Sequence, residues 1–323
     1  MNRRRSILIA SLLALAAPLH VVAQDEWPSK VVKFVVPYGA GGSTDALARL
    51  VAQRLSDRWG KSVIVENKPG ANGIIGTDGV AKSPPDGYTF LVASNGQAVN
   101  VALRSNLPYD MLRDFVSVVN IAAMPNVLAI HKAQPAQTLK DLVAQAKTKP
   151  GSLAFGHAGV GSSQHLTGEI LKLEAKIDIR QVPYKGGGPA VADALGGHVP
   201  LVVAGVPAMS QHVKSGALRA LAVTGPKRSP QLPDVPTMQE QGYRNDEVFW
   251  VALMAPKGTP PAVVARLNAE VNAVLADPAV KAKFAEQGAE VSGGTPEQFD
   301  AFLKREIENA ARVIKAANIK ADG

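Results

Sequence analysis

Short apolar runs and helical repeats of apolar residues follow one another along this chain. Residues 31–36 form a nearly continuous apolar run, of a length typical of a buried strand. Leu47, Val51 and Leu55 then recur at helical spacing. Gly60 follows them and supplies a helix stop. This segment therefore predicts a strand, a Gly-rich loop and a helix, in that order.

The same unit of strand, loop and helix recurs twice further along the chain. The second copy has a strand at 153–155 and a loop at 156–161 before a capped helix. The third has an extended segment at 179–183 and a loop at 184–188, with Pro189 at the first helical position. Further strands are predicted at 63–66, 88–93 (ending in a turn at 94–96), 116–123, 127–130, 201–203, 218–223 and 249–255. Further helices are predicted at 76–82, from Thr138 onward, and at 261–275, 278–287 and 295–318.

This order of elements predicts an α/β fold of two lobes. Met124-Pro125-Asn126 is interpreted as a crossing point, because a fresh strand begins just after it. A second crossing is expected near 246–249, where the chain returns to the first lobe. The expected lobes are 24–124 plus 248–323 and 125–247, with a cleft between them.

Residues 1–23 have the pattern of a cleaved export signal. Arg3, Arg4 and Arg5 precede an 11-residue apolar run, which is too short to span a bilayer as an anchor would. Both the general secretion route and the twin-arginine route fit this start. Removing the three arginines lowers the formal net charge from +8 to +5.

Composition narrows the function classes. With 46% hydrophobic and 19% charged residues, the chain is suited to a large core and not to disorder or a coiled coil. No basic run longer than two residues follows the export signal, which disfavours nucleic acid as a partner. The absence of Cys excludes disulfides and thiolate chemistry, and in an exported chain it suits a bacterial periplasm.

Two of the Gly-rich loops have the chemistry of anion sites. A loop that feeds a helix leaves backbone N–H groups without intrahelical partners at the positive end of the helix dipole. If both helices face the cleft, they can hold carboxylates; the alternative is that the glycines only permit tight turns. The candidate residues are Gly39, Gly41, Gly42, Ser43 and Thr44 in the first loop and Gly159, Gly161, Ser162 and Ser163 in the second.

Several side chains near these loops leave alternatives open. Asp45 either favours the helix N-terminus or accepts hydrogen bonds from a water or a ligand. His157 either donates to a carboxylate or faces solvent, whereas His165 is expected to be a satisfied histidine near a helix start. Tyr184 and Lys185, in the third loop, are further ligand candidates.

No enzyme motif is complete. Both Gly41-Gly42-Ser43-Thr44-Asp45 and Gly161-Ser162-Ser163-Gln164-His165 lack the final Gly of the nucleophile elbow. The dinucleotide and P-loop patterns also fail, and the histidines lack zinc-ligand spacing. We therefore predict no catalytic residue, metal or cofactor. A periplasmic hydrolase that uses Ser43 or Ser163 remains a distant alternative, because neither serine has an evident base.

Motifs spread over the whole mature chain resemble those of the Bug receptors, the periplasmic solute-binding proteins of tripartite tricarboxylate transporters. The matching runs are Pro37-Tyr38-Gly39-Ala40-Gly41-Gly42-Ser43-Thr44-Asp45-Ala46-Leu47-Ala48-Arg49, Val65-Glu66-Asn67-Lys68-Pro69-Gly70-Ala71, Pro85-Asp86-Gly87-Tyr88-Thr89, Gly159-Val160-Gly161-Ser162-Ser163-Gln164-His165-Leu166, Val182-Pro183-Tyr184-Lys185-Gly186 and Ala255-Pro256-Lys257-Gly258-Thr259-Pro260.

The resemblance implies a type II periplasmic binding fold that closes like a flytrap. It implies a carboxylate held between the loop at 38–45, which includes Ala40, and the loop at 157–163, with Ser94 and Asn95 nearby. It also implies a membrane permease with a large and a small subunit, driven by an ion gradient; a sensor kinase is the alternative partner. Both lobes look complete, so a monomer is expected.

Two departures from the family pattern bear on specificity. His157 stands where a polar residue is expected, and residues 199–205 lack the acidic groups common in the family. We therefore expect a di- or tricarboxylate, aromatic ones included, in preference to an acidic amino acid.

Overall fold

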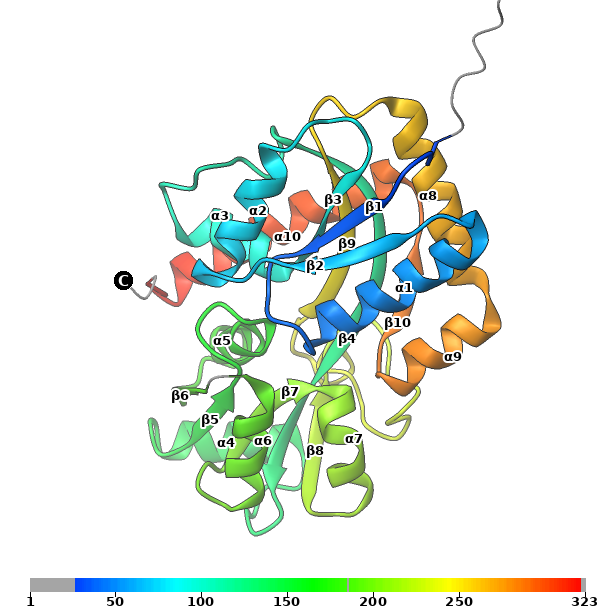
Figure 1. The fold of residues 1–323 in the computed structure, drawn as a ribbon. Helices are drawn as coiled ribbons and strands as arrows, with labels where there is room; N and C mark the ends of the chain where they lie inside the picture. Colours follow the sequence, from blue (N-terminus) through cyan, green and yellow to red (C-terminus); the bar gives the residue numbers. More distant parts are fainter. Residues whose placement is uncertain (1–26, 185, 321–323) are drawn as a thin grey trace, which may run out of the picture.

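One long strand, β4 (Phe115–His131), belongs to both halves of the molecule (Figure 1). The computed structural model describes residues 27–184 and 186–320, so the predicted export signal lies outside the described residues. Residues 115–125 of β4 pair with β9 (Val248–Pro256), and residues 126–131 pair with strands of the second half. The prediction of two separate strands meeting at Met124-Pro125-Asn126 is therefore wrong. The fixed φ of Pro125 is compatible with extended backbone, so the strand continues through it.

The first lobe is built on a mixed sheet in the order β2-β1-β3-β9-β4, with β10 also paired to β4. β1 is parallel to β2 and β3, whereas β9 is antiparallel to both of its neighbours. The other strands are β1 (Val32–Val36), β2 (Val63–Asn67), β3 (Thr89–Ser94) and β10 (Glu290–Gly293). The helices are α1 (Ser43–Trp59), α2 (Ile74–Ala81), α3 (Asn95–Leu103), α8 (Pro261–Ala276), α9 (Pro278–Glu286) and α10 (Pro296–Ala316).

The second lobe continues the sheet in the order β4-β7-β5-β6, and β8 also pairs with β4. Its strands are β5 (Ala154–His157), β6 (Arg180–Pro183), β7 (Leu201–Gly205) and β8 (Leu218–Val223). Its helices are α4 (Leu139–Thr148), α5 (Ser163–Ala175), α6 (Gly187–Leu195) and α7 (Val206–Lys214). Two short 3-10 turns lie at Ala71–Gly73 and Gln239–Gln241. The expected two-lobed α/β architecture is confirmed (Figure 1).

Three elements were not predicted: α3, α7 and β10. The run Ser94-Asn95-Gly96 has turn composition, yet α3 begins there because Gln97 accepts a hydrogen bond from the Ser94 backbone N–H (2.8 Å). Pro189 is the third residue of α6 and not the first, because the helix begins at Gly187. Within the described residues, no helix is long and apolar enough to cross a membrane.

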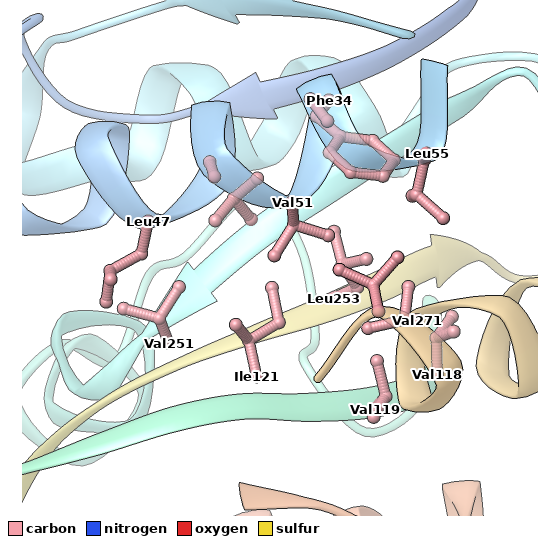
Figure 2. Packing of buried hydrophobic residues seen from close by; sticks show 14 of the residues in the cluster. Phe34, Leu47, Val51, Leu55, Val118, Val119, Ile121, Val251, Leu253 and Val271 are labelled. Atoms are coloured by element: carbon pink, nitrogen blue, oxygen red, sulfur yellow. The ribbon is translucent and has the colours of Figure 1, made fainter. Parts of the chain in front are cut away.

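Each lobe has its own hydrophobic core, and a smaller cluster joins them. In the first lobe, the apolar face of α1 packs on Phe34 and on residues of β4, β9 and α8 (Figure 2). The second core is divided between the two faces of the second half of the sheet. The joining cluster brings together side chains from α3, α5 and α10: Val99, Leu166, Ile170, Ala310, Val313 and Ile314.

The first-lobe core predicts a large cost for truncating one of its central leucines. Leu253 is 0% exposed within this cluster. Leu253→Ala should lower the free energy of unfolding by about 2–5 kcal/mol in denaturant titrations, since a cavity replaces packed side-chain atoms. The matched control is Leu112→Ala at a side chain that is 45% exposed; we expect a change within about 0.5 kcal/mol there. Equal losses in the two variants would contradict this account of the core.

Candidate functional site

The two predicted anion loops meet at one cavity of about 310 Å³ between the lobes. The predicted site residues that line it are Tyr38, Gly42, Ser43, Thr44, Asp45, Ser94, Asn95, Gly159, Gly161, Ser162 and Ser163. Asn72 and Phe249 also contribute to the wall and were not predicted. Asn72 precedes α2 and Phe249 belongs to β9, so sequence spacing gives no indication that either approaches the loops.

Three helices begin at the wall of this cavity. The first residues of α1, α3 and α5 are Ser43, Asn95 and Ser163, and all three line it. The first-turn N–H groups of a helix have no intrahelical acceptor, and the helix dipole makes this end positive. The cavity wall therefore concentrates hydrogen-bond donors with partial positive charge.

The first loop is closed by the carboxylate of Asp45, the third residue of α1. One oxygen accepts from the Gly41 N–H (2.9 Å) and from Arg49 Nε (3.0 Å), and the other accepts from Asn67 Nδ2 (2.9 Å). Burial raises the pKa of Asp45, but the hydrogen bonds from Arg49, Gly41 and Asn67 outweigh it and hold that pKa below its ordinary value. Asp45 is thus an ionised loop-closing group at a helix N-terminus.

The second loop is closed by a histidine at the equivalent place. His165, the third residue of α5, accepts from the Gly161 N–H at Nδ1 (3.2 Å). Its ring stacks on that of His157, with the centroids 4.5 Å apart. His157 Nε2 lies 2.5 Å from Gln181 Oε1, and its Nδ1 lies beside the backbone of Gly159.

Both histidines are buried behind the loop. His165 is therefore the satisfied histidine that was expected. His157 is 0% exposed, so the solvent-facing interpretation is wrong, and its side chain does not line the cavity. Burial lowers the pKa of both rings, that of His165 to about 3, with the neighbouring His157 and Lys172 adding to the effect.

The sequence matches the model of the tripartite tricarboxylate transporter family receptor over residues 47–319. The chain belongs to this family. It is 40% identical to protein BugT of Bordetella pertussis, over 99% of each chain. Among solved structures it is similar to Rpa4515 of R. palustris with adipate (38% identity, TM-score 0.80, 91% of this chain and 99% of that one). It is also similar to MatC of Rhodopseudomonas palustris with bound malate (31% identity, TM-score 0.75, 89% and 99%). The type II periplasmic binding fold implied by the sequence motifs is thus confirmed.

In this receptor, a hydrogen-bonded chain supports the first-lobe side of the cavity. Ser94 Oγ donates to Tyr38 Oη (3.1 Å), and Tyr38 Oη donates to Gln97 Oε1 (3.4 Å). Gln97 Nε2 continues the chain to Thr77 Oγ1 (3.2 Å). Burial raises the pKa of Tyr38, so its hydroxyl stays protonated. This series of hydrogen bonds ties the first loop to the start of α3.

Four predicted site residues of the receptor lie away from the cavity lining. Ala40 and Gly41 belong to the first loop without facing the cavity, and His157 lies behind the second. Tyr184 donates from Oη to Asp193 (2.7 Å), and burial together with that carboxylate raises its pKa to about 12. Lys185 lies outside the described residues.

The serine-hydrolase alternative has no geometric support at Ser163 of the receptor. Ser163 Oγ is buried and, within the described residues, has no hydrogen-bond partner, so no histidine is positioned to deprotonate it. His165 uses Nδ1 for the Gly161 N–H. Among residues 27–184 and 186–320, no group of three or more His, Asp or Glu side chains is arranged to hold a metal.

A larger hollow of about 780 Å³ lies near the second crossing and is a weaker candidate site. Four of its charged lining residues are already paired within the protein, Lys227 with Glu290 and Arg244 with Asp246. A ligand there would have to compete with these ion pairs.

The low pKa of His165 predicts acid destabilisation of the receptor. Its pKa is about 3 in the folded chain against an ordinary 6.5, so below pH 6.5 the unfolded state binds a proton that the folded state does not. The free energy of unfolding should fall with pH by up to ~1.4 kcal/mol per unit.

His165→Asn removes this titration and should flatten the dependence between pH 6.5 and 4. Denaturant titrations of both proteins at several pH values measure the difference. Parallel curves would mean that His165 does not remain neutral in the folded state.

Proposed function

We propose that this receptor captures a small di- or tricarboxylate between the N-termini of α1, α3 and α5. The observation that supports this most strongly is the convergence of three helix starts on one cavity. Among the described residues that line it, Asp45 is the sole charged side chain, and Arg49 compensates that charge. The relatives Rpa4515 and MatC carry adipate and malate in their structures, which agrees in ligand class.

Direct contacts to the ligand are assigned to the helix starts. The first-turn N–H groups and the hydroxyls of Ser43, Thr44, Ser162 and Ser163 act as donors to the carboxylates, with Asn95 alongside. Ser163 Oγ is the best placed side-chain donor, because it is buried at the cavity wall without a protein partner.

The size and lining of the cavity also favour a carboxylate without an amino group over an acidic amino acid. About 310 Å³ is at the small end of ligand pockets and suits a diacid of a few carbons. Phe249 offers an apolar surface to the carbon chain. Both oxygens of Asp45 already accept hydrogen bonds from the protein, which leaves little capacity for an ammonium group. A deaminated carboxylate is therefore preferred to an acidic amino acid.

Capture is coupled to closure of two lobes, 24–124 with 248–323 and 125–247, about β4 and the second crossing. The closed receptor then presents itself in the periplasm to a membrane permease with a large and a small subunit. A sensor kinase that recognises the same closed form is the alternative partner. The receptor acts as a monomer without catalysis, and its export depends on residues 1–23.

Thermal unfolding of the mature chain against a carboxylate panel tests this function. The panel contains malate, succinate, adipate, citrate, phthalate, aspartate and glutamate. A ligand at 100 times its dissociation constant should add about 2.7 kcal/mol and raise the melting temperature by several degrees. We expect shifts with a subset of the di- or tricarboxylates and smaller ones with the amino acids. No shift from any carboxylate would refute the proposal.

Ser163→Ala should separate ligand affinity from stability. Removing a hydroxyl that has no protein partner should leave the melting temperature of the free receptor unchanged or raise it. The dissociation constant for the tightest carboxylate should rise about 10- to 100-fold, as for a lost hydrogen bond to a charged group, when measured by calorimetry.

The matched control is Ser210→Ala on α7, where another buried serine lies outside the cavity lining. It should leave the affinity unchanged. Unaltered binding by Ser163→Ala would remove this hydroxyl from the site.

A further inference from the structure

The two ligand loops contain the same hydrogen bond at the same offset in sequence. The Gly41 N–H donates to Asp45, and the Gly161 N–H donates to His165. Both glycines are in the left-handed region, with φ of +84° and +80°. Each acceptor is the third residue of the following helix. The second lobe therefore reproduces the loop closure of the first with a different side chain.

The two closures differ in charge. Asp45 places a carboxylate in the first turn of α1, where it compensates the helix dipole. His165 places a buried imidazole in the first turn of α5.

Two titratable side chains, Glu169 and His157, lie against the His165 ring. Glu169 Oε1 lies 3.9 Å from Nε2 and is itself paired with Lys172 at 2.9 Å, and the stacked ring is that of His157. The low pKa of both rings keeps them neutral near pH 7. The positive end of α5 is thus left uncompensated in its first turn.

We propose that His165 is a positioning residue: its neutral ring accepts the Gly161 N–H and so fixes the second ligand loop. Because this closure adds no negative charge, it directs a carboxylate of the ligand to the start of α5. This inference rests on the proposed function. The Gly161 N–H is turned into the protein by its bond to Nδ1, which leaves the N–H groups of Ser163 and Gln164 for the ligand. The first loop, where the carboxylate of Asp45 offsets the dipole of α1, provides the weaker of the two carboxylate sites.

Three substitutions at position 165 test the hydrogen-bond acceptor and its charge separately. His165→Asn keeps a neutral acceptor close to the position of Nδ1. His165→Asp keeps an acceptor but adds a negative charge, as Asp45 does in the first lobe. His165→Leu removes the acceptor and leaves the Gly161 N–H without a partner. His198→Asp makes the same change as the second variant at an exposed position outside the cavity lining and is the matched control.

Calorimetry with adipate and malate, on the mature chain at pH 7.5, measures how each substitution changes the dissociation constant. His165→Asn should bind within about threefold of the wild type. His165→Asp should bind at least about tenfold more weakly, because a like charge then lies directly behind the second loop, and His198→Asp should bind as the wild type does. If His165→Asp binds as tightly as His165→Asn, the charge assignment is wrong.

Amide hydrogen exchange at Gly161 gives a readout that does not need a ligand. The Gly161 N–H should be protected in the wild type and in His165→Asn and should exchange faster in His165→Leu. Equal exchange in all three would overturn the positioning role. If the wild type binds neither probe nor any other carboxylate of the panel, the proposed function fails, while the exchange experiment still decides whether His165 holds the loop.

Discussion

The site depends on one topological constraint: β1, β3 and β5 all end at the boundary between the lobes, and each passes directly or through a Gly-rich loop into a helix. The parallel strands β1 and β3 bring their carboxyl ends to one edge of the first lobe. β5 runs in the opposite direction in the second lobe, so its carboxyl end meets theirs across the boundary and the three helices begin together. Their unpaired N–H groups and dipoles then add at one cavity. No basic side chain among the described lining residues is needed to create this potential.

The loops that form the wall hold their shape with their own hydrogen bonds. Asp45 ties the first loop to Arg49 and, through Asn67, to the end of β2; Asn67 Nδ2 also donates to the Tyr38 carbonyl (3.1 Å). His165 and the stacked His157 support the second loop from behind. Donors that are already oriented lose less entropy when a ligand arrives, so such loops suit a receptor that must bind a small molecule with few contacts.

The contact between the lobes combines apolar packing with buried acids. α10 ends beside α5, and its last turns complete the apolar cluster with α3 (Figure 1). Next to it, Glu306 accepts from Trp250 Nε1 (3.0 Å), and Glu247 lies buried at the second crossing. Burial raises the pKa of Glu306 to about 7 and that of Glu247 well above its ordinary range, so neutral carboxyls are favoured here. Any relative movement of the lobes has to rearrange this packing, which places α10 among the elements that set the energy of closure.

The sequence by itself determined the alternation of strands and helices, the two Gly-rich loops and the two-lobed fold, because these follow from local periodicity, capping and turn composition. It also identified most of the residues at the cavity, although Ser94 and Asn95 were indicated only by the resemblance to the receptor family. It did not determine that β4 continues through Pro125, since this depends on pairing with the distant strand β9. The start of α3 at Asn95 was missed although its capping box of Ser94 and Gln97 is local, because Ser94-Asn95-Gly96 also has turn composition. The contributions of Phe249 and Asn72 and the burial of His157 were also decided only by tertiary structure. Whether a polar side chain faces a ligand or supports a loop from behind depends on packing between segments that no sequence spacing records. The same limit applies to His165: its role as an acceptor for Gly161 became apparent only when the two loops were compared in space.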